Sequence, residues 1–412
     1  MFYQKTNRFI FLLISIVTII LVTLLIIVSV TSGNTEAKIL EKKVIKIEKA
    51  TEFSQNCYYD PKQKWLSADV DVYIPLFRDT EQNGIWLFGD TIIGDIDNQT
   101  NKKVLQGFLR NSVGVVKGDP LSGKSSSTYY WTHHPNISNA KSFFLHPKEP
   151  DYWYWAINGI SFTNENNTDS TLILFVLEMK FENDQPMGLN FEVNKCLTFK
   201  FESSKQDLLL NLQNPQFTIA EIPRQNSTNW ISSIVYNDTE KNLYLIGSKP
   251  NNKTNHAVLS RISKENLLKE DWSHVEYLFE NNTFLHSSDK VIPNLKLLFR
   301  NIPQESVFYY MPKFDKWVVL MGEFFTANVY MRVSDNLTGE WSNQISIFTV
   351  PAPYDDLNKY LLTTIKIQKH FITQENKIIF TYIINAGNWP ELLKIGVYVP
   401  IWMRIEFNEN YF

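Results

Sequence analysis

The stretch Gly84-Ile85-Trp86-Leu87-Phe88-Gly89-Asp90-Thr91-Ile92-Ile93-Gly94 decides the fold class of this chain. Its apolar run from Ile85 to Phe88 is short and is bounded by glycine on both sides, which favours a buried strand over a helix. Gly89 lets the backbone turn, or approach a neighbour, where a Cβ atom would clash. The stretch therefore predicts a strand that runs into a glycine and an acid.

A second β-rich run lies upstream, Asp69-Val70-Asp71-Val72-Tyr73-Ile74-Pro75-Leu76, and a polar turn around Glu81–Gly84 separates the two runs. Two such strands joined by a turn predict a β-hairpin. Acids stand at the ends of both strands. The hairpin is therefore expected to present carboxylates at the mouth of a β fold.

Length and composition set the broad class. A chain of 412 residues can hold one large β domain or two ordinary ones. Aromatic residues make up 14% of the chain, and they favour strands. The formal net charge is only −3, so nothing in the charge balance indicates nucleic acid or an acidic partner.

The segment Phe9–Val30 has no charged residue and consists mostly of Ile, Leu and Val. A bilayer core needs about 20 such residues, whereas a secretory signal core is usually shorter. We therefore expect a short cytoplasmic tail at 1–8 and an uncleaved transmembrane signal-anchor at 9–30. A cleaved signal peptide is the alternative, with Thr31-Ser32-Gly33 offering small residues for cleavage.

Basic residues flank the apolar segment on both sides, so the positive-inside rule does not decide its orientation. Asparagine glycosylation signals favour a lumenal or extracellular body, because most of them fall in polar turns between expected strands. They lie at Asn98, Asn136, Asn166, Asn226, Asn237, Asn252, Asn281 and Asn336. We expect a single-pass type II membrane protein at the cell surface or in the secretory-pathway lumen, or a secreted protein if the N-terminal segment is cleaved.

The chain has two cysteines, Cys57 and Cys196, and both lie beyond the apolar segment. In an oxidising compartment they could form one disulfide that ties the segment before the first hairpin to a later strand. Two buried free thiols are the alternative, and the sequence leaves the choice open.

A charged stalk is expected over 31–64, with one candidate strand at Lys43–Ile47, followed by one domain over 65–412. In this domain β runs alternate with polar turns in five similar units, and the last unit contains the runs Tyr360–Phe371, Lys377–Ile384, Ile395–Val399 and Trp402–Phe407. The short segment Lys264–Glu270 is the one helical candidate. Radial repetition of four-stranded sheets, a five-bladed β-propeller, explains this pattern. A pair of β-sandwiches is the alternative.

Several motifs together carry a family resemblance. Trp86-Leu87-Phe88-Gly89-Asp90-Thr91 resembles the signature of uncharacterised extracellular proteins with an LFGDT motif, which are similar to the five-bladed β-propeller glycoside hydrolase superfamily. Further similar segments follow in the same order and cover roughly Trp65 to Phe407. They are Arg110-Asn111-Ser112-Val113-Gly114, Tyr152-Trp153-Tyr154-Trp155-Ala156-Ile157-Asn158-Gly159, Leu243-Tyr244-Leu245-Ile246-Gly247-Ser248, Ser334-Asp335-Asn336-Leu337-Thr338-Gly339-Glu340-Trp341-Ser342 and Ile379-Phe380-Thr381-Tyr382-Ile383-Ile384-Asn385.

The chain departs from the family at two places. Glu340 stands where the family has proline, and Ile365-Lys366-Ile367-Gln368 stands where its last blade often has His-Pro. The second departure puts any substrate contact at that position in doubt.

The resemblance implies an axial site at which carboxylates from several blades converge. Glycoside cleavage needs one carboxyl group to protonate the leaving oxygen and a second one on the other face, with pKa values held apart. Asp71 and Glu305 are the expected catalytic pair. The alternative for Asp71 is a structural acid that caps backbone amides. The alternative for Glu305 is an exposed loop glutamate, and this alternative is favoured. A third carboxylate is not evident.

The expected substrate-binding residues surround this pair: Asp69, Asp90, Arg110, Asn111, Trp153, Trp155 and Asn158. For Arg110 an ion pair with Asp90 is favoured over a substrate contact. For the tryptophans, core packing is favoured over stacking on sugar rings.

Two functions remain open. The first is a membrane-anchored propeller that hydrolyses or binds glycans; the second is a non-catalytic ectodomain that binds a glycan or a protein. The histidines lack metal-ligand spacing, so no metal site is expected. No cofactor is expected either, although a calcium ion in the propeller channel is left open. The expected partners are a glycan or glycoconjugate and, through the N-terminal helix, a membrane, but no nucleic acid.

Overall fold

The structure, a computed structural model, describes residues 44–57, 63–77, 84–122, 125–131, 138–181, 191–204, 217–223, 228–251, 254–286, 292, 294–303, 305–322, 326–354, 356–408 and 412. The predicted cytoplasmic tail and signal-anchor lie outside these residues. Within the described part, no helix combines the length and the apolar character that a membrane span requires. The chain divides into a small unit, Met1–Lys46 with Phe407–Phe412, and a large unit, Ile47–Glu406, which is the subject below.

The described residues confirm the predicted all-β class, and their strands form six sheets. In five of the sheets the strands pair in sequence order, apart from two exceptions. One sheet skips two strands of the chain, and another one takes the first described strand as its outermost member. We call these five sheets blades one to five.

Blades one to three contain the first part of the chain. Blade one consists of β3 (Val72–Pro75), β4 (Gly84–Phe88), β7 (Ser112–Lys117) and β8 (Ser126–Tyr130). Blade two consists of β9 (Tyr152–Thr163), β10 (Asp169–Phe181), β11 (Phe191–Ser204) and β12 (Thr218–Ile222). Blade three consists of β13 (Asn229–Asn237), β14 (Asn242–Asn251), β15 (Thr254–Ser263), β16 (Glu276–Leu278) and β17 (Phe284–His286).

Blades four and five contain the rest. Blade four consists of β18 (Val307–Met311), β19 (Lys316–Gly322), β20 (Asn328–Ser334) and β21 (Ile345–Thr349). Blade five consists of β22 (Tyr360–Ile367), β23 (Lys377–Ala386), β24 (Ile401–Phe407) and β1 (Val44–Lys49). The helices are short: α3 (Lys264–Leu268), α4 (Trp389–Leu392), η1 (Thr51–Cys57), η2 (Trp272–His274), η3 (Pro312–Phe314) and η4 (Lys369–Phe371). The first of these confirms the predicted helical candidate.

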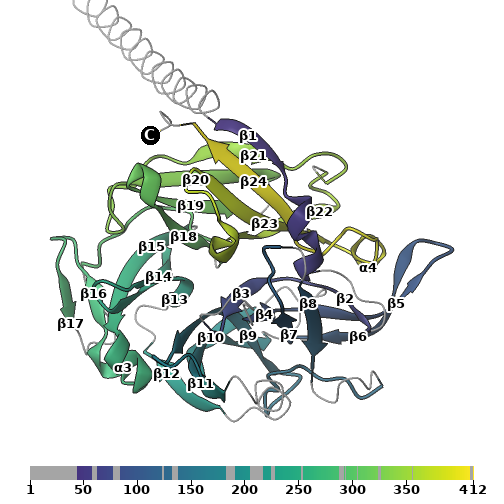
Figure 1. Cartoon of the computed structure of the whole chain (residues 1–412), viewed down its shortest axis with the longest axis horizontal. Helices are drawn as coiled ribbons and strands as arrows, with labels where there is room; N and C mark the ends of the chain where they lie inside the picture. Colours follow the sequence, from purple (N-terminus) through teal and green to yellow (C-terminus); the bar gives the residue numbers. More distant parts are fainter. Residues whose placement is uncertain are drawn as a thin grey trace, which may run out of the picture. The chain divides into compact units, whose positions relative to one another are not determined.

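The first strands of consecutive blades contact one another, β3 with β9, β9 with β13, β13 with β18 and β18 with β22. Between the last blade and the first, Gln368 donates a hydrogen bond of 2.9 Å to the main-chain oxygen of Asp71. Figure 1 shows the blades of the large unit grouped around a common centre. This strand order and grouping are those of β-propeller blades.

The sixth sheet branches from blade one and contains β2 (Trp65–Ala68), β5 (Thr91–Asp97) and β6 (Lys102–Leu109). The predicted hairpin is present, with Val72 opposite Leu87 in the antiparallel pair β3–β4. The apolar run after Gly84 is longer than one strand because the chain turns at Gly89 and Asp90 and continues into this other sheet.

Two segments of blade five differ from the sequence-based expectation. The strand predicted at Ile395–Val399 is wrong, because Gly396 (φ 85°) and Tyr398 (φ 59°) adopt left-handed conformations that break a strand. The outermost strand is instead β1, from the segment predicted as a stalk. Next to it, the Ala50 amide donates to the Trp402 oxygen at 3.0 Å, so the folded sheet begins before the predicted boundary at Trp65.

The core lies between adjacent blades. Four buried apolar clusters join blade one to two, two to three, three to four, and five to one. In the last of these, the fully buried Trp86 packs against Tyr73, Phe371 and Trp402 with ring centroids 5.1 to 6.0 Å apart. Aromatic side chains bury a large apolar area each, so they account for much of the packing that holds neighbouring blades together.

Gly89 is required by close approach, not by an unusual backbone angle. A Cβ atom on this residue would lie 2.3 Å from Asp69 Oδ1 and 2.4 Å from Trp155 Nε1. Its amide donates a hydrogen bond of 3.0 Å to the Asp69 oxygen. The glycine therefore lets the segment before β3 press against the end of β4.

We expect Gly89→Ala to lower the free energy of unfolding by roughly 1–3 kcal/mol, because the added methyl group overpacks this contact. Urea denaturation measures the change. Gly387→Ala is the matched control, since a Cβ atom there meets no described heavy atom within 4 Å. Equal losses of stability in the two variants would contradict the close-approach argument.

Candidate axial carboxylate site

The site is built on the three residues that precede β3. Val70 (φ 74°) and Asp71 (φ 41°) both adopt left-handed backbone conformations. This conformation is unfavourable for any residue with a Cβ atom and most of all for a β-branched one. The surrounding contacts must therefore impose it. They do so through Asp69, whose main-chain oxygen accepts hydrogen bonds of 3.0 Å from the amides of both Gly89 and Asp71.

Asp71 is fully buried between blades one and five. Its Oδ2 atom accepts hydrogen bonds from Thr381 Oγ1 at 2.5 Å and from Gln368 Nε2 at 3.1 Å. Its Oδ1 atom is buried and has no hydrogen-bond partner among the described residues. Burial raises the pKa of Asp71 well above its ordinary value, against the effect of the two donors and of Lys366.

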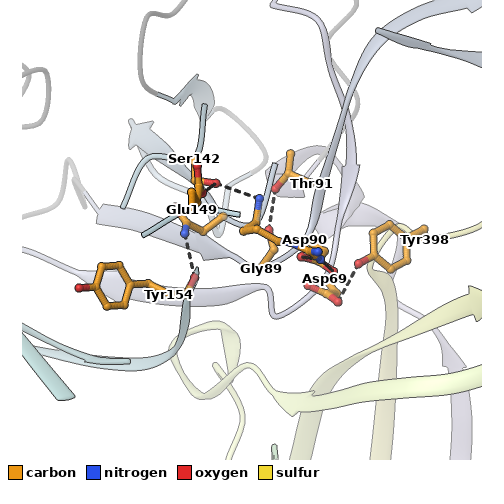
Figure 2. Close-up of polar contacts among 10 residues, drawn as sticks. Asp69, Gly89, Asp90, Thr91, Ser142, Glu149, Tyr154 and Tyr398 are labelled. Carbon is orange, nitrogen blue, oxygen red and sulfur yellow. Dashed lines mark hydrogen bonds and ion pairs between the residues drawn. The ribbon is translucent and has the colours of Figure 1, made fainter. Parts of the chain in front are cut away.

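Asp69 lies beside Asp71 and is also nearly inaccessible, with 7% of its surface exposed. The hydroxyl of Tyr398 donates to Asp69 Oδ2 at 2.7 Å, as Figure 2 shows. Burial raises the pKa of Asp69 well above its ordinary value, and the charges of Asp90 and Glu305 raise it further. The pKa of Tyr398 is also raised, first by burial and then by Asp69. This hydrogen bond therefore keeps its proton on the tyrosine.

Glu305 precedes β18 and reaches the same region from blade four. Its side chain is only 11% exposed, and its Oε2 atom lies 3.0 Å from the Nζ atom of Lys366 on β22. The contact is an ion pair, and Glu305 Oε2 accepts no hydrogen bond from the described residues. The alternative of an exposed loop glutamate is therefore wrong for Glu305, because its side chain is largely covered and lies beside an ammonium group.

Asp90 follows Gly89 and completes a group of four acids. Its carboxylate lies 3.4 Å from Arg110 Nη1, which confirms the ion pair favoured from the sequence. The guanidinium group also lies 4.6 Å from the ring centre of Trp153. Burial raises the pKa of Asp90 to about 6, although Arg110 opposes the shift. Together these contacts hold Asp90 near Asp69. The charge of Asp90 adds to the effect of burial in raising the pKa of Asp69.

The other expected substrate contacts have different surroundings. Asn111 has no exposed surface; its amide group donates to the oxygens of Phe144 and Tyr154 and accepts from the Phe144 amide. It therefore fixes main chain between blades one and two instead of facing a ligand. Trp153 belongs to the core between blades two and three, and the half-buried Trp155 packs against it.

A narrow pocket runs along the axis next to these acids. It has about 40 Å³ of open volume. It is lined by Asp71 and by residues from all five first strands, among them Val72, Asn158, Ser233, Val307 and Lys366. Asn158 also donates to the Ile231 oxygen at 2.7 Å, which joins blades two and three. The acids Asp69, Asp90 and Glu305 do not line this pocket. Asp71 lines the pocket together with three basic residues, Lys366, Lys369 and His370.

Sequence reasoning missed three residues of the site: Lys366, Gln368 and Tyr398. The available signal was a lysine and a glutamine within the apolar run of the last blade, at the position where the family pattern is broken. A lysine that is 1% exposed needs a partner, and Glu305 supplies it. Tyr398 gave no signal, because the segment around it resembles a strand.

The remaining predicted sites are only partly described. Asn98, Asn166, Asn281 and Asn336 are exposed in turns or bends, Asn237 is half-buried, and Asn136, Asn226 and Asn252 lie outside the described residues. Cys196 is buried, with its Sγ atom 3.8 Å from Asn229 Oδ1, but the side chain of Cys57 lies outside the description. The disulfide and the glycans therefore stay predictions. The described His, Cys, Asp and Glu residues form no group that could hold a metal ion.

Residues 52–406 match the family described as "Domain of unknown function (DUF5005)". No curated protein matches the sequence. A structure of a candidate hydrolase from Bacteroides ovatus is 15% identical, covers 88% of this chain and 90% of its own, and superposes with a TM-score of 0.65. This likeness shows a shared fold.

Two further structures are less similar. The exo-β-1,3-galactanase from Phanerochaete chrysosporium, bound to β-1,3-galactotriose, is 11% identical over 88% of this chain and 63% of its own, with a TM-score of 0.42. The GH43_1 enzyme from Xanthomonas citri, complexed with xylose, is 9% identical over 90% of this chain and 92% of its own, with a TM-score of 0.35. The predicted resemblance to the LFGDT group stays a prediction.

We expect Asp71→Asn to be more stable than the wild-type protein at pH 7, by about 1 kcal/mol or more. A buried acid with a raised pKa holds its proton in the folded state at pH values where the unfolded chain has lost it. Its contribution to the free energy of unfolding is therefore highest below about pH 4 and falls as the pH rises. Asparagine keeps an acceptor for Thr381 and Gln368 and does not titrate.

Urea denaturation between pH 4 and 8 measures the difference, which should shrink toward pH 4. Asp238→Asn is the control, because the Asp238 side chain is 83% exposed and its ion pair with Lys241 contributes little. A loss of stability in Asp71→Asn at pH 7 would show that the site holds an ionised, satisfied carboxylate.

Proposed function

We propose that this chain, which belongs to the family described as "Domain of unknown function (DUF5005)", is a glycoside-hydrolase-like five-bladed propeller that hydrolyses or binds glycans at its central axis. One observation carries the proposal. Carboxyl groups from different blades gather beside an axial pocket: Asp69 and Asp71 before β3, and Glu305 before β18. Burial raises the pKa of Asp69 and of Asp71, and the charge of Glu305 raises both further. Such groups of interacting acids are typical of sites for acid–base chemistry.

The paired-acid mechanism assigns different roles to the two central carboxyl groups. Burial raises the pKa of Asp71, so this residue suits a group that holds a proton until it is needed. Glu305 has the ammonium group of Lys366 at 3.0 Å as its counter-charge, so it suits the ionised member of the pair. Asp69, held by Tyr398, is a third carboxyl group, and the charges of Glu305 and Asp71 add to the effect of burial in raising its pKa.

The membrane anchor belongs to the same proposal. The apolar segment Phe9–Val30 would hold the propeller at the lumenal or extracellular side, where glycans occur, and the exposed acceptor asparagines would carry glycans of their own. A glycan or glycoconjugate is the proposed partner of the axial site.

A non-catalytic binding function is the second candidate, and one observation favours it. The carboxyl group of Asp71 has no exposed surface, and the axial pocket has room for only a few water molecules, less than a sugar ring needs. In this reading the acids stabilise a rigid centre, and a glycan or protein binds to the face around it.

Turnover of glycosides distinguishes the two functions. We expect the full-length protein to hydrolyse at least one member of a panel of aryl glycosides and oligosaccharides. Asp71→Asn and Glu305→Gln should each reduce kcat at least 100-fold, because general acid–base groups contribute roughly 10²–10⁴-fold. Asp238→Asn, an exposed acid away from the axis, should leave kcat unchanged.

Circular dichroism and urea denaturation must show that the inactive variants are folded. Unchanged turnover in Asp71→Asn would remove this residue from the mechanism. If the wild-type protein turns over no substrate but binds members of a glycan array, the binding function is supported. Neither activity nor binding would contradict both candidates.

A further inference from the structure

A groove, larger than the axial pocket, lies between blades three and four at the ends of β13 and β18. It has about 530 Å³ of open volume, which is within the range of ligand sites. One wall is formed by 234–239, which end β13 and begin its turn; the other is formed by 308–310 and Trp317. It meets the axial pocket at Ile234 and Lys369, which line both.

The wall from blade four is aromatic and rigid. Tyr310 is 37% exposed, and its ring centre lies 5.3 Å from that of the half-buried Trp317. The Tyr310 hydroxyl donates to Asp315 Oδ1 at 2.6 Å, which fixes the position of the ring. Large aromatic surfaces of this kind suit the apolar C–H faces of sugar rings, while the polar edges of the sugar remain in water.

The opposite wall carries a glycosylation signal, Asn237-Asp238-Thr239, in the turn between β13 and β14. Asn237 Oδ1 accepts from the amides of Thr239 at 3.0 Å and Glu240 at 3.2 Å. This turn fixes the oxygen of the side-chain amide against the main chain. The nitrogen, which is the atom that receives a glycan, is thereby directed away from the turn, on a residue that lines the groove.

We propose that this groove holds the chain's own N-glycan, attached at Asn237 and packed against Tyr310 and Trp317. The occupant follows from the geometry, because a glycan on a residue of the groove wall starts inside the groove and excludes an external ligand from it. The proposal depends on the lumenal or extracellular placement of the domain. It does not depend on glycoside turnover at the axis.

Asn281 provides a matched control on the same molecule. It is also an acceptor in a turn, with its Oδ1 atom bonded to the Thr283 amide at 3.2 Å, but it is exposed and does not line the groove. A glycan on Asn281 should therefore be free in solvent. A glycan on Asn237 should be shielded by the groove.

The test uses the full-length protein expressed in a secretory pathway that adds N-glycans. Site-resolved mass spectrometry follows release of each glycan by a peptide N-glycosidase under native conditions. We expect both sites to be occupied and the Asn237 glycan to be released at least 10-fold more slowly than the Asn281 glycan. The difference should disappear after denaturation.

A second variant separates packing from simple crowding. Tyr310→Ala removes the exposed ring and should bring the release rate at Asn237 close to that at Asn281 without changing occupancy. Asn237→Gln should increase acrylamide quenching of tryptophan fluorescence, because Trp317 loses its cover.

Three results would overturn the proposal. An occupied Asn281 beside an unoccupied Asn237 contradicts the proposal but leaves the lumenal placement intact. Equal native release rates at both sites contradict the packing. Absence of glycans from both sites removes the premise of lumenal placement, and it leaves glycoside turnover at the axis to be judged separately.

Discussion

The structure depends on the hydrogen bonds that Asp71 accepts where it is buried between blade five and blade one. The Oδ2 atom of Asp71 accepts hydrogen bonds from Thr381 and Gln368, and the main-chain oxygen of Asp71 accepts a second one from Gln368. A β-propeller has one place where its last blade must pack against its first blade to close the ring. Here polar contacts make this joint at the axis, while β1 and the aromatic cluster around Trp86 make it farther out.

This joint has an electrostatic cost, and the cost explains the other polar residues around it. Buried carboxyl groups are unfavourable when ionised, and several of them close together are more so. The chain offsets this with donors and with a counter-charge: Tyr398 binds Asp69, Lys366 pairs with Glu305, and Arg110 pairs with Asp90. Strained backbone at Val70 and Asp71 adds to the cost. Unfavourable features gathered at one point are typical of functional sites.

The sequence predicted the β units well, because alternating apolar runs and polar turns are local signals. It also located Asp71 and the ion pair between Arg110 and Asp90, which lie near each other in sequence. It failed where the decisive partner is distant, as for Lys366 and Glu305, or where a turn looks like a strand, as for Ile395–Val399. Burial of Asn111 was equally invisible, since an asparagine between strands resembles a ligand-binding residue until its neighbours are known.

The departure from the family pattern in the last blade is best understood together with the first blade. At Ile365-Lys366-Ile367-Gln368 the chain lacks the residues that the resemblance led us to expect, which placed a substrate contact in doubt. Yet Lys366 contacts Glu305 directly, and Gln368 contacts Asp71 directly. The sequence change therefore places a lysine and a glutamine against the acids. Since a shared fold at 15% identity fixes strand order and not chemistry, the proposed turnover depends on whether a lysine and a glutamine leave these acids able to exchange protons.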